Sequence, residues 1–312
     1  MFNLIATTIE HCTRQLRQGY ADTYGSLKSD YAEILSWATQ MALESIAQSD
    51  APYHDVEHTV LVTLTGQEIL RGKHLREGGV TPEDWLHCIL SLLCHDIGYI
   101  KGLCGGDRPQ QRLYTTGLQG ELIKLAPGAT DASLTPYHVD RGKQFVLERF
   151  GGHRLIDVRQ IQQNIELTRF PIPQGEVHQQ TQTYPGLIRA ADLLGQLADP
   201  RYLQKLSGLF QEFVETGAHQ ALGYANADEL RAGFPEFYRN VVQPYVGPGL
   251  AFLNVTQSGQ QVVANLYANL FKVEQGIGGQ TPRRHSSPPS PPSRSASSGG
   301  RQRYPQLLMA VV

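Results

Sequence analysis

The chain has 312 residues and a mass of 34.6 kDa, a length that suits one domain with appendages. Hydrophobic residues make up 40% of it and charged residues only 18%, so a substantial core can form beneath a weakly charged surface. The formal net charge is −2, but five arginines and no acid or lysine follow Gly276, which leaves −7 for the preceding residues. A body this acidic disfavours nucleic acid as a partner.

The cysteine count and the hydropathy pattern bear on location. Four cysteines without zinc-finger spacing exclude a secreted disulfide scaffold and favour a reducing compartment. No apolar stretch reaches the roughly 18 residues of a membrane span, and the first residues lack the basic region of a signal peptide. We therefore expect a cytoplasmic protein with no membrane partner.

Helical spacing of apolar residues dominates the chain. The sharpest start is at Thr81, a predicted N-cap followed by Pro82 at the first helical position and two acids in the first turn. Residues 102–135 are rich in Gly and Pro and predict loops with a short helix at 117–125, and the only strand candidate is 251–256. The remaining periodicity predicts helices at about 4–18, 29–47, 56–71, 81–96, 139–150, 155–168, 185–198, 200–215, 228–246 and 257–273.

This pattern predicts an all-α, multi-helix bundle. We divide the chain into N-terminal helices that pack on the body (1–50), the body itself (51–275) and a tail (276–312). The tail is rich in Pro, Ser, Gly and Arg and has no core-forming pattern, so we expect it to be disordered. Its apolar end, residues 307–312, either frays or docks on the body or a partner.

Three segments place polar groups where burial would be costly. His54 and His58 are four residues apart and share a face of a helix. His95–Asp96 closes an apolar helix, and Asp192 lies among apolar neighbours. Buried charges are generally paired or bind metals. One divalent cation held by His58, His95, Asp96 and Asp192 would satisfy all three segments and leave positions open for water and substrate.

Each of these signals also has a simpler interpretation. Asp192 can form a salt bridge with a neighbour such as Arg189. A lone histidine on a helix is more often an ordinary core or surface residue, and a bare His-Asp doublet arises by chance. The argument for a metal therefore depends on the combination of the segments, in this order and on these helices.

The order of these residues resembles a known family. The series His58, His95–Asp96, Asp192 is similar to that of the HD-domain metal-dependent phosphohydrolases, and its spacings of 37 and 96 residues fit that fold. The segment Tyr53–His58 further resembles the Y-H-N-x-x-H signature of class I cyclic-nucleotide phosphodiesterases, with Asp55 in place of the usual Asn. The resemblance covers roughly half of the chain.

The resemblance implies an HD-domain-like bundle and a set of residue roles. His58, His95, Asp96 and Asp192 would bind a first metal ion, and Asp96 would also bridge to a second. His54 would protonate the leaving oxygen, which makes His54 and Asp96 the expected catalytic residues. The expected cofactor is one or two ions of Mn²⁺, Fe²⁺, Mg²⁺ or Zn²⁺, because nitrogen and oxygen ligands without a thiolate suit these metals with open sites.

The chain departs from the family patterns at two points. The phosphodiesterase pattern H-D-x-x-H ends here in Tyr99, and the H-D-I-G-K and G-Y-P motifs of relatives acting on cyclic dinucleotides are incomplete or missing. His138, at the start of a predicted helix, resembles the later histidine of binuclear HD proteins. It is a candidate metal ligand or phosphate contact, with a capping or surface residue as the alternative.

Further polar residues near these segments are candidates for supporting roles. Lys101 and Arg141 could bind a substrate phosphate, or be solvated surface cations. Asp55 or Glu57 could orient an imidazole, or be exposed helix charges. Glu166 and Thr168 lie on a predicted helix that could face the site; they complete the set of candidates.

We therefore expect an enzyme, a metal-dependent hydrolase that cleaves a phosphate ester, such as a cyclic nucleotide or nucleotide phosphodiester, with metal-activated water. The expected partner is this small-molecule substrate. Two alternatives stay open: a nucleotidase or triphosphohydrolase on the same scaffold, and a non-catalytic HD regulator that binds a nucleotide or protein.

Overall fold

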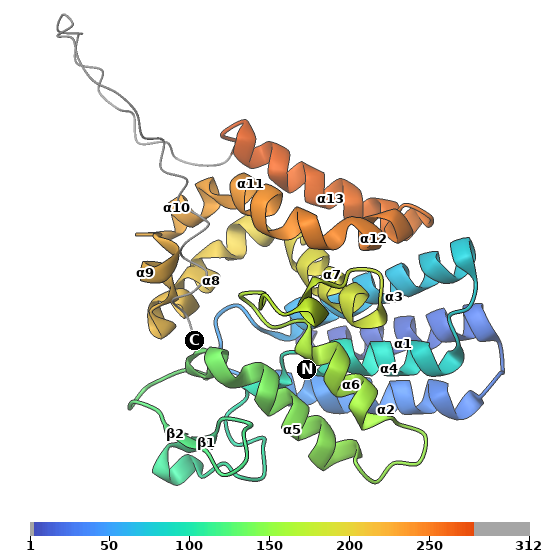
Figure 1. Ribbon diagram of the computed structural model, residues 1–312, viewed down its shortest axis with the longest axis horizontal. Helices are drawn as coiled ribbons and strands as arrows, with labels where there is room; N and C mark the ends of the chain where they lie inside the picture. Colours follow the sequence, from blue (N-terminus) through green and yellow to red (C-terminus); the bar gives the residue numbers. More distant parts are fainter. Residues whose placement is uncertain (1–2, 278–312) are drawn as a thin grey trace, which may run out of the picture.

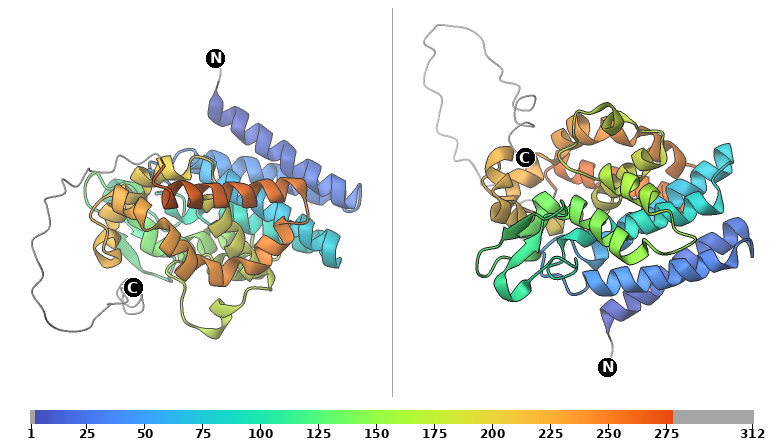
Figure 2. Two further views of the ribbon diagram at one scale, coloured as in Figure 1. Left: turned by 90° about the horizontal axis from the view of Figure 1, so that it is seen from above. Right: turned by 60° about the horizontal axis from the view of Figure 1, so that its bottom comes forward.

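The computed structural model describes residues 3–277 and shows an all-α bundle (Figure 1). The predicted fold class is confirmed, and the predicted tail, 276–312, lies outside the described residues except for Gly276 and Ile277. The two N-terminal helices, α1 (Leu4–Tyr24) and α2 (Ser29–Ile46), lie side by side at one edge of the bundle (Figure 2). They pack against α3 (Val56–Glu77) and α4 (Pro82–Cys94) and share the main apolar core with them.

Helix α4, which precedes His95 and Asp96, is deeply buried. Every residue from Trp85 to Cys94 is buried, which is the pattern of a helix surrounded by others. Its start is as predicted, because the Thr81 hydroxyl accepts from the Asp84 amide while the Asp84 carboxylate accepts from the Thr81 amide. Two helices, α6 (Val158–Glu166) and α7 (Tyr184–Leu197), pack against it, and α5 (His138–Phe150) packs against α6.

Close contact between α3 and α7 depends on glycine. A Cβ added at Gly195 would lie 2.6 Å from the Cα of Val62, nearer than carbon atoms can approach, so only glycine allows these two backbones to meet. His58 lies one turn before Val62, and Asp192 lies one turn before Gly195. The contact therefore holds together the parts of α3 and α7 that carry His58 and Asp192.

The segment between α4 and α5 contains a small antiparallel hairpin, β1 (Leu113–Thr115) and β2 (Leu122–Lys124), with Leu113 opposite Lys124. The helix predicted at 117–125 is wrong. Gly117 and Gly120 both have φ near +80°, a conformation that suits a tight turn and ends a helix. Short 3₁₀ helices complete the segment: η1 (Ile97–Tyr99), η2 (Pro109–Gln111) and η3 (Asp131–Tyr137).

The C-terminal part of the bundle is built from shorter pieces. The helix predicted at 228–246 is broken, because Gly233 is followed by Pro235 and Pro244, and proline lacks the amide donor that a continuous helix needs. The strand predicted at 251–256 is wrong, since Thr256 caps a helix. The elements are α8 (Tyr202–Thr216), α9 (Ala218–Leu222), α10 (Ala227–Ala232), α11 (Phe234–Phe237), the π-helical η5 (Tyr238–Val242), α12 (Gln243–Leu253) and α13 (Gln257–Glu274).

Two further observations concern the expected location. Among residues 3–277, no helix combines the length and the apolar character needed to cross a membrane. All four cysteines are buried and form no disulfide.

Candidate metal centre and adjoining cavity

Two helix ends and the middle of a third helix bring the candidate ligands to one place. His58 lies in the first turn of α3, whose N-cap Asp55 accepts from the His58 amide at 2.9 Å. His95 is the C-cap of α4, and Asp96 follows it at the start of η1. Asp192 lies in the middle of α7. These side chains come from separate elements and point into the same interior space.

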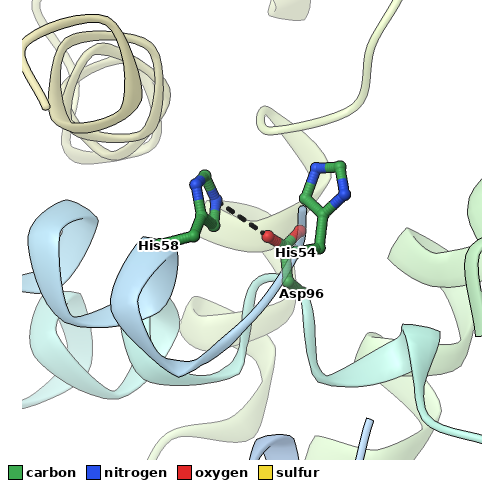
Figure 3. A group of neighbouring side chains, drawn as sticks. All are labelled: His54, His58 and Asp96. Atoms are coloured by element: carbon green, nitrogen blue, oxygen red, sulfur yellow. Dashed lines mark ion pairs between the residues drawn. The ribbon is translucent and has the colours of Figure 1, made fainter. Parts of the chain in front are cut away.

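The four side chains meet at short distances. The Nε2 atoms of His58 and His95 lie 3.0 and 3.1 Å from Oδ2 of Asp96. The same nitrogens lie 3.9 and 3.7 Å from Oδ1 of Asp192. The donor atoms of His58, His95 and Asp192 are all within 4.8 Å of one another, as are those of His54, His58 and Asp96. Figure 3 shows the Asp96 carboxylate between the rings of His54 and His58.

Three of these atoms are buried and have no hydrogen-bond partner among the described residues: Nε2 of His58, Nε2 of His95 and Oδ2 of Asp96. The His95 ring places its other nitrogen, Nδ1, 2.6 Å from the carbonyl oxygen of Leu92. Because a carbonyl only accepts, Nδ1 carries a proton, and Nε2 faces Asp96 and Asp192, where it can hold either a second proton or a metal ion. Buried polar atoms are seldom left without partners, so these residues are suited to hold a cation.

The electrostatics of the cluster also favour a cation. Burial raises the pKa of Asp192. Burial acts in the same direction on Asp96, but the charge of His95 and contacts with both histidines outweigh it and hold the pKa of Asp96 well below its ordinary value. Burial lowers the pKa of His95, and the Asp96 carboxylate more than reverses this and raises it to about 9. The carboxylates thus attract positive charge. A metal ion at this place would compete with the proton that the His95 ring binds.

His138 lies at the edge of this cluster. Its Nε2 is 3.8 Å from Oδ1 of Asp96, and its Nδ1 is 2.6 Å from the carbonyl oxygen of Thr135. Burial lowers the pKa of His138 to about 4, so the ring is neutral at pH 7. A Cβ at Gly98 would lie 1.9 Å from the carbonyl oxygen of His138, so glycine at this position is what lets η1 and α5 approach.

Tyr99 occupies the space between two of the predicted histidines. Its ring stacks on His54 with centroids 4.5 Å apart and on His138 with centroids 4.6 Å apart. Tyr99 stands where the H-D-x-x-H pattern has a histidine, and its phenol is buried. The sequence departure therefore places an aromatic spacer between His54 and His138.

Glu212, on α8, is the site residue that the sequence analysis missed. Its Oε2 lies 2.5 Å from Nδ1 of His54, and its Oε1 accepts from the amide of Tyr53 at 2.6 Å. Burial lowers the pKa of His54, but the ion pair and hydrogen bond with Glu212 outweigh it, and with Asp96 and Asp192 raise that pKa to about 9. The only sequence signal is an acid between Phe210 and Phe213.

A cavity of about 200 Å³ adjoins the cluster. Its polar end is formed by His54, Asp96, His138, Asp192 and Glu212. Thr168 also contributes to the lining, as do apolar side chains from α8 to η5. A concave site in which a few polar groups converge among apolar walls is typical of small-molecule binding.

Comparison with known proteins places the chain in a family. A family profile described as Npun_R2479-like matches residues 2–276. The chain belongs to the Npun_R2479-like family. No curated protein matches it. The description of the family names neither a reaction nor a ligand, so the function of this Npun_R2479-like protein has to be argued from the residues of the site.

The structure corrects the two predicted phosphate contacts of this Npun_R2479-like protein. Arg141 is fully buried and donates to both carboxylate oxygens of Asp107 at 2.9 Å, and its remaining hydrogen bonds go to backbone carbonyls. Lys101 contacts Asp50 and Asp131 and donates to the carbonyl of Ala129. Neither side chain lines the cavity. Each instead forms ion pairs and hydrogen bonds that hold loops together.

The predicted supporting acids are likewise engaged elsewhere. Asp55 caps α3 and Glu57 pairs with Arg201 and Lys205, so Glu212 orients His54 in their place. Glu166 pairs with Lys143 and Arg169 and does not line the cavity. The alternative partner for Asp192 is also excluded, because Arg189 donates to backbone carbonyls of His178 and Gln180.

Proposed function

We propose that this protein is a metal-dependent hydrolase of phosphate esters, related to the HD-domain phosphohydrolases that its motif series resembles. One observation carries the proposal. Two imidazole nitrogens and a carboxylate oxygen are buried without hydrogen-bond partners in the part of the chain that the structure describes. They converge from α3 and from the segment that follows α4, opposite Asp192 on α7. Burying such atoms is costly, and a shared divalent cation removes that cost.

The residues present fit a catalytic metal better than a structural one. His58, His95, Asp96 and Asp192 supply nitrogen and oxygen donors without a thiolate, a set that suits Mn²⁺, Fe²⁺, Mg²⁺ or Zn²⁺. His138 is near enough to Asp96 to take part in holding a second ion. The cluster opens on a cavity, whereas structural sites are closed. A bound divalent cation supplies Lewis acidity and makes water a stronger acid at neutral pH.

The chain's own residues supply the proton. Hydrolysis forms a bond between phosphorus and the oxygen of water and breaks the bond from phosphorus to the ester oxygen. The ester oxygen takes a proton from His54, and water gives up one of its own to solvent. The Glu212 carboxylate keeps His54 protonated at neutral pH and holds its ring in place. Tyr99 packs on the same ring and limits its movement.

Elemental analysis of the purified protein tests the metal site. We expect about one or more divalent ions per chain in the wild type and a loss of at least about tenfold in Asp96→Ala. Asp157→Ala is the matched control, since Asp157 caps α6 and does not line the cavity. Equal metal content in the wild type and Asp96→Ala would contradict the proposal.

A substrate panel on the same proteins tests the reaction. It contains cyclic nucleotides, nucleoside mono- and triphosphates, and an aryl phosphodiester. We expect hydrolysis by the wild type and by Asp157→Ala, and none by Asp96→Ala. Release of inorganic phosphate identifies a monoesterase, and its absence with a cyclic substrate identifies a phosphodiesterase. A metal-loaded wild type that cleaves nothing in the panel would count against a hydrolase.

A further inference from the structure

The cavity beside the metal centre has two ends of opposite chemistry. Away from the polar end, the walls come from the loop after α6 and from α8, α10 and α11. We define the apolar chamber by the side chains that form this end: Phe170, Leu209, Phe213, Leu230, Phe234 and Phe237. An apolar lining favours an apolar occupant, because burying apolar surface away from water is favourable and hydrogen-bonding groups would lose their partners.

Helix α8 connects the chamber to the proton donor. Leu209, Glu212 and Phe213 are spaced i, i+3 and i+4 and share one face of that helix. Glu212 contacts His54, while its two neighbours on this face line the chamber. A leaving oxygen that receives the proton of His54 is therefore next to the chamber, and the group it carries extends into it.

The cations of the lining are already engaged. Arg169 pairs with Glu166 and Asp140. Arg189 donates to backbone carbonyls and lies over the Tyr245 ring, 4.3 Å from its centroid. Among the described residues that line the cavity, no other lysine or arginine is present. The buried Nε of Arg189 has no hydrogen-bond partner among residues 3–277. A polyphosphate chain would therefore find few free cationic donors here, and a triphosphate is disfavoured.

The size of the cavity limits the organic group. A cavity of about 200 Å³ compares with the ~150 Å³ apolar cavities that admit a benzene ring. A single ring or a short branched chain fits this volume, whereas a base, a ribose and further phosphates together would extend beyond it. The cavity is thus too small and too apolar to enclose an extended nucleotide.

We propose that the substrate is a phosphate ester of a small apolar alcohol, of about one aromatic ring, whose organic group occupies the apolar chamber while its ester oxygen faces His54. This inference rests on the proposed function for its reaction, but the binding preference of the chamber can be measured without it. Specificity then comes from the leaving alcohol, which the loop after α6 and the C-terminal helices contact.

Matched esters test the preference. Benzyl phosphate and glycerol 3-phosphate, each as monoester and as methyl diester, present primary alcohols that differ chiefly in polarity, and AMP adds the nucleotide case. We expect kcat/KM for the cleaved benzyl ester to exceed that of the glycerol ester by about tenfold to a hundredfold, the gain from burying one ring. A preference for glycerol 3-phosphate or AMP would overturn the inference.

A pair of leucine variants locates the effect. Leu230→Gln introduces an amide into the chamber, and Leu203→Gln is the control, because Leu203 is also partly buried but does not line the cavity. We expect Leu230→Gln to lower the benzyl-to-glycerol ratio about tenfold through KM, and Leu203→Gln to leave it unchanged. Equal ratios in both variants would overturn the assignment of the chamber.

Binding to chelated protein separates this inference from the proposed function. In EDTA, saturation-transfer NMR should show benzyl alcohol binding to the wild type and to Leu203→Gln, with loss of the signal in Leu230→Gln and none for glycerol. If benzyl alcohol binds but no ester is cleaved, the hydrolase proposal falls and the ligand class stands. If benzyl alcohol does not bind the wild type, the inference is wrong whatever the activity.

Discussion

The metal centre and the Arg141–Asp107 ion pair are two buried charged centres in one bundle, and they differ in whether their polar atoms have partners. At Arg141, the guanidinium meets two carboxylate oxygens and three backbone carbonyls, and both side chains are about 1% exposed or less. At the metal centre, His58, His95 and Asp96 keep atoms that have no hydrogen-bond partner among residues 3–277.

The difference shows how burial should be interpreted in this protein. A fully hydrogen-bonded ion pair stabilises the loops it joins. Removing one partner leaves the other charge buried and unpaired. An unsatisfied cluster costs stability until something else binds. The sequence analysis left Arg141 as either a phosphate contact or a solvated surface cation. Its partners in the folded chain show that it is a buried structural residue instead.

The largest expected effect on stability is at the Arg141–Asp107 ion pair. Arg141→Met should destabilise the protein by about 3–5 kcal/mol, because Asp107 would remain buried without its partner. Urea unfolding measures this, with Arg149→Met, an exposed arginine on the same helix, as the control. Metal content per folded chain should not change. A decrease in the free energy of unfolding below about 1 kcal/mol would contradict the view that Arg141 and Asp107 form a stabilising structural pair.

The proton donor gives the next effect. His54→Gln should lower turnover by at least about a hundredfold, the low end of what a positioned acid contributes, while metal content stays at the wild-type level. Steady-state kinetics and elemental analysis check both, and exposed His11→Gln is the control. Loss of metal in His54→Gln would instead make His54 a ligand, as its distance from His58 and Asp96 permits.

The His54–Glu212 pair predicts a pH dependence of stability in chelated protein. The pKa of His54 is about 9 in the folded protein against about 6.5 in an unfolded chain. The stabilisation is therefore fully present below pH 6.5 and is lost as the pH rises through about 9. We expect Glu212→Gln to remove about 1–3 kcal/mol at pH 6 and much less at pH 10.

Urea unfolding in EDTA at pH 6 and pH 10 measures this, with Glu236→Gln, an exposed acid, as the control. An equal loss of stability at the two pH values would mean that Glu212 acts by packing or by its backbone hydrogen bonds alone.

The smallest effect has the opposite sign. Asp192→Asn in chelated protein should raise the free energy of unfolding by about 1 kcal/mol, because burial disfavours the carboxylate charge and the amide carries none. The same change should weaken metal binding in untreated protein. Thermal unfolding with and without EDTA shows both, and a loss of stability in EDTA would mean that Asp192 already has adequate partners.

Much of the fold could be predicted from local sequence. The capping box at Thr81 and the long amphipathic patterns located most helices, because these signals depend on neighbours within one turn. The hairpin at Leu113–Lys124 and the broken helices after Ala227 were missed. Short elements such as these depend on glycine and proline conformations and on packing, which periodicity does not report.

The sequence by itself determined which residues needed a partner: His58, His95, Asp96 and Asp192 are polar groups on apolar or capped helices, and their burial follows from the pattern around them. Only the tertiary structure decided which polar groups have a partner. Glu212 reaches His54 from 158 residues away, and Arg141 and Lys101 are taken up by Asp107, Asp50 and Asp131. Hydrogen bonds and ion pairs depend on distances of a few ångströms, and folding sets those distances between segments that are far apart along the chain.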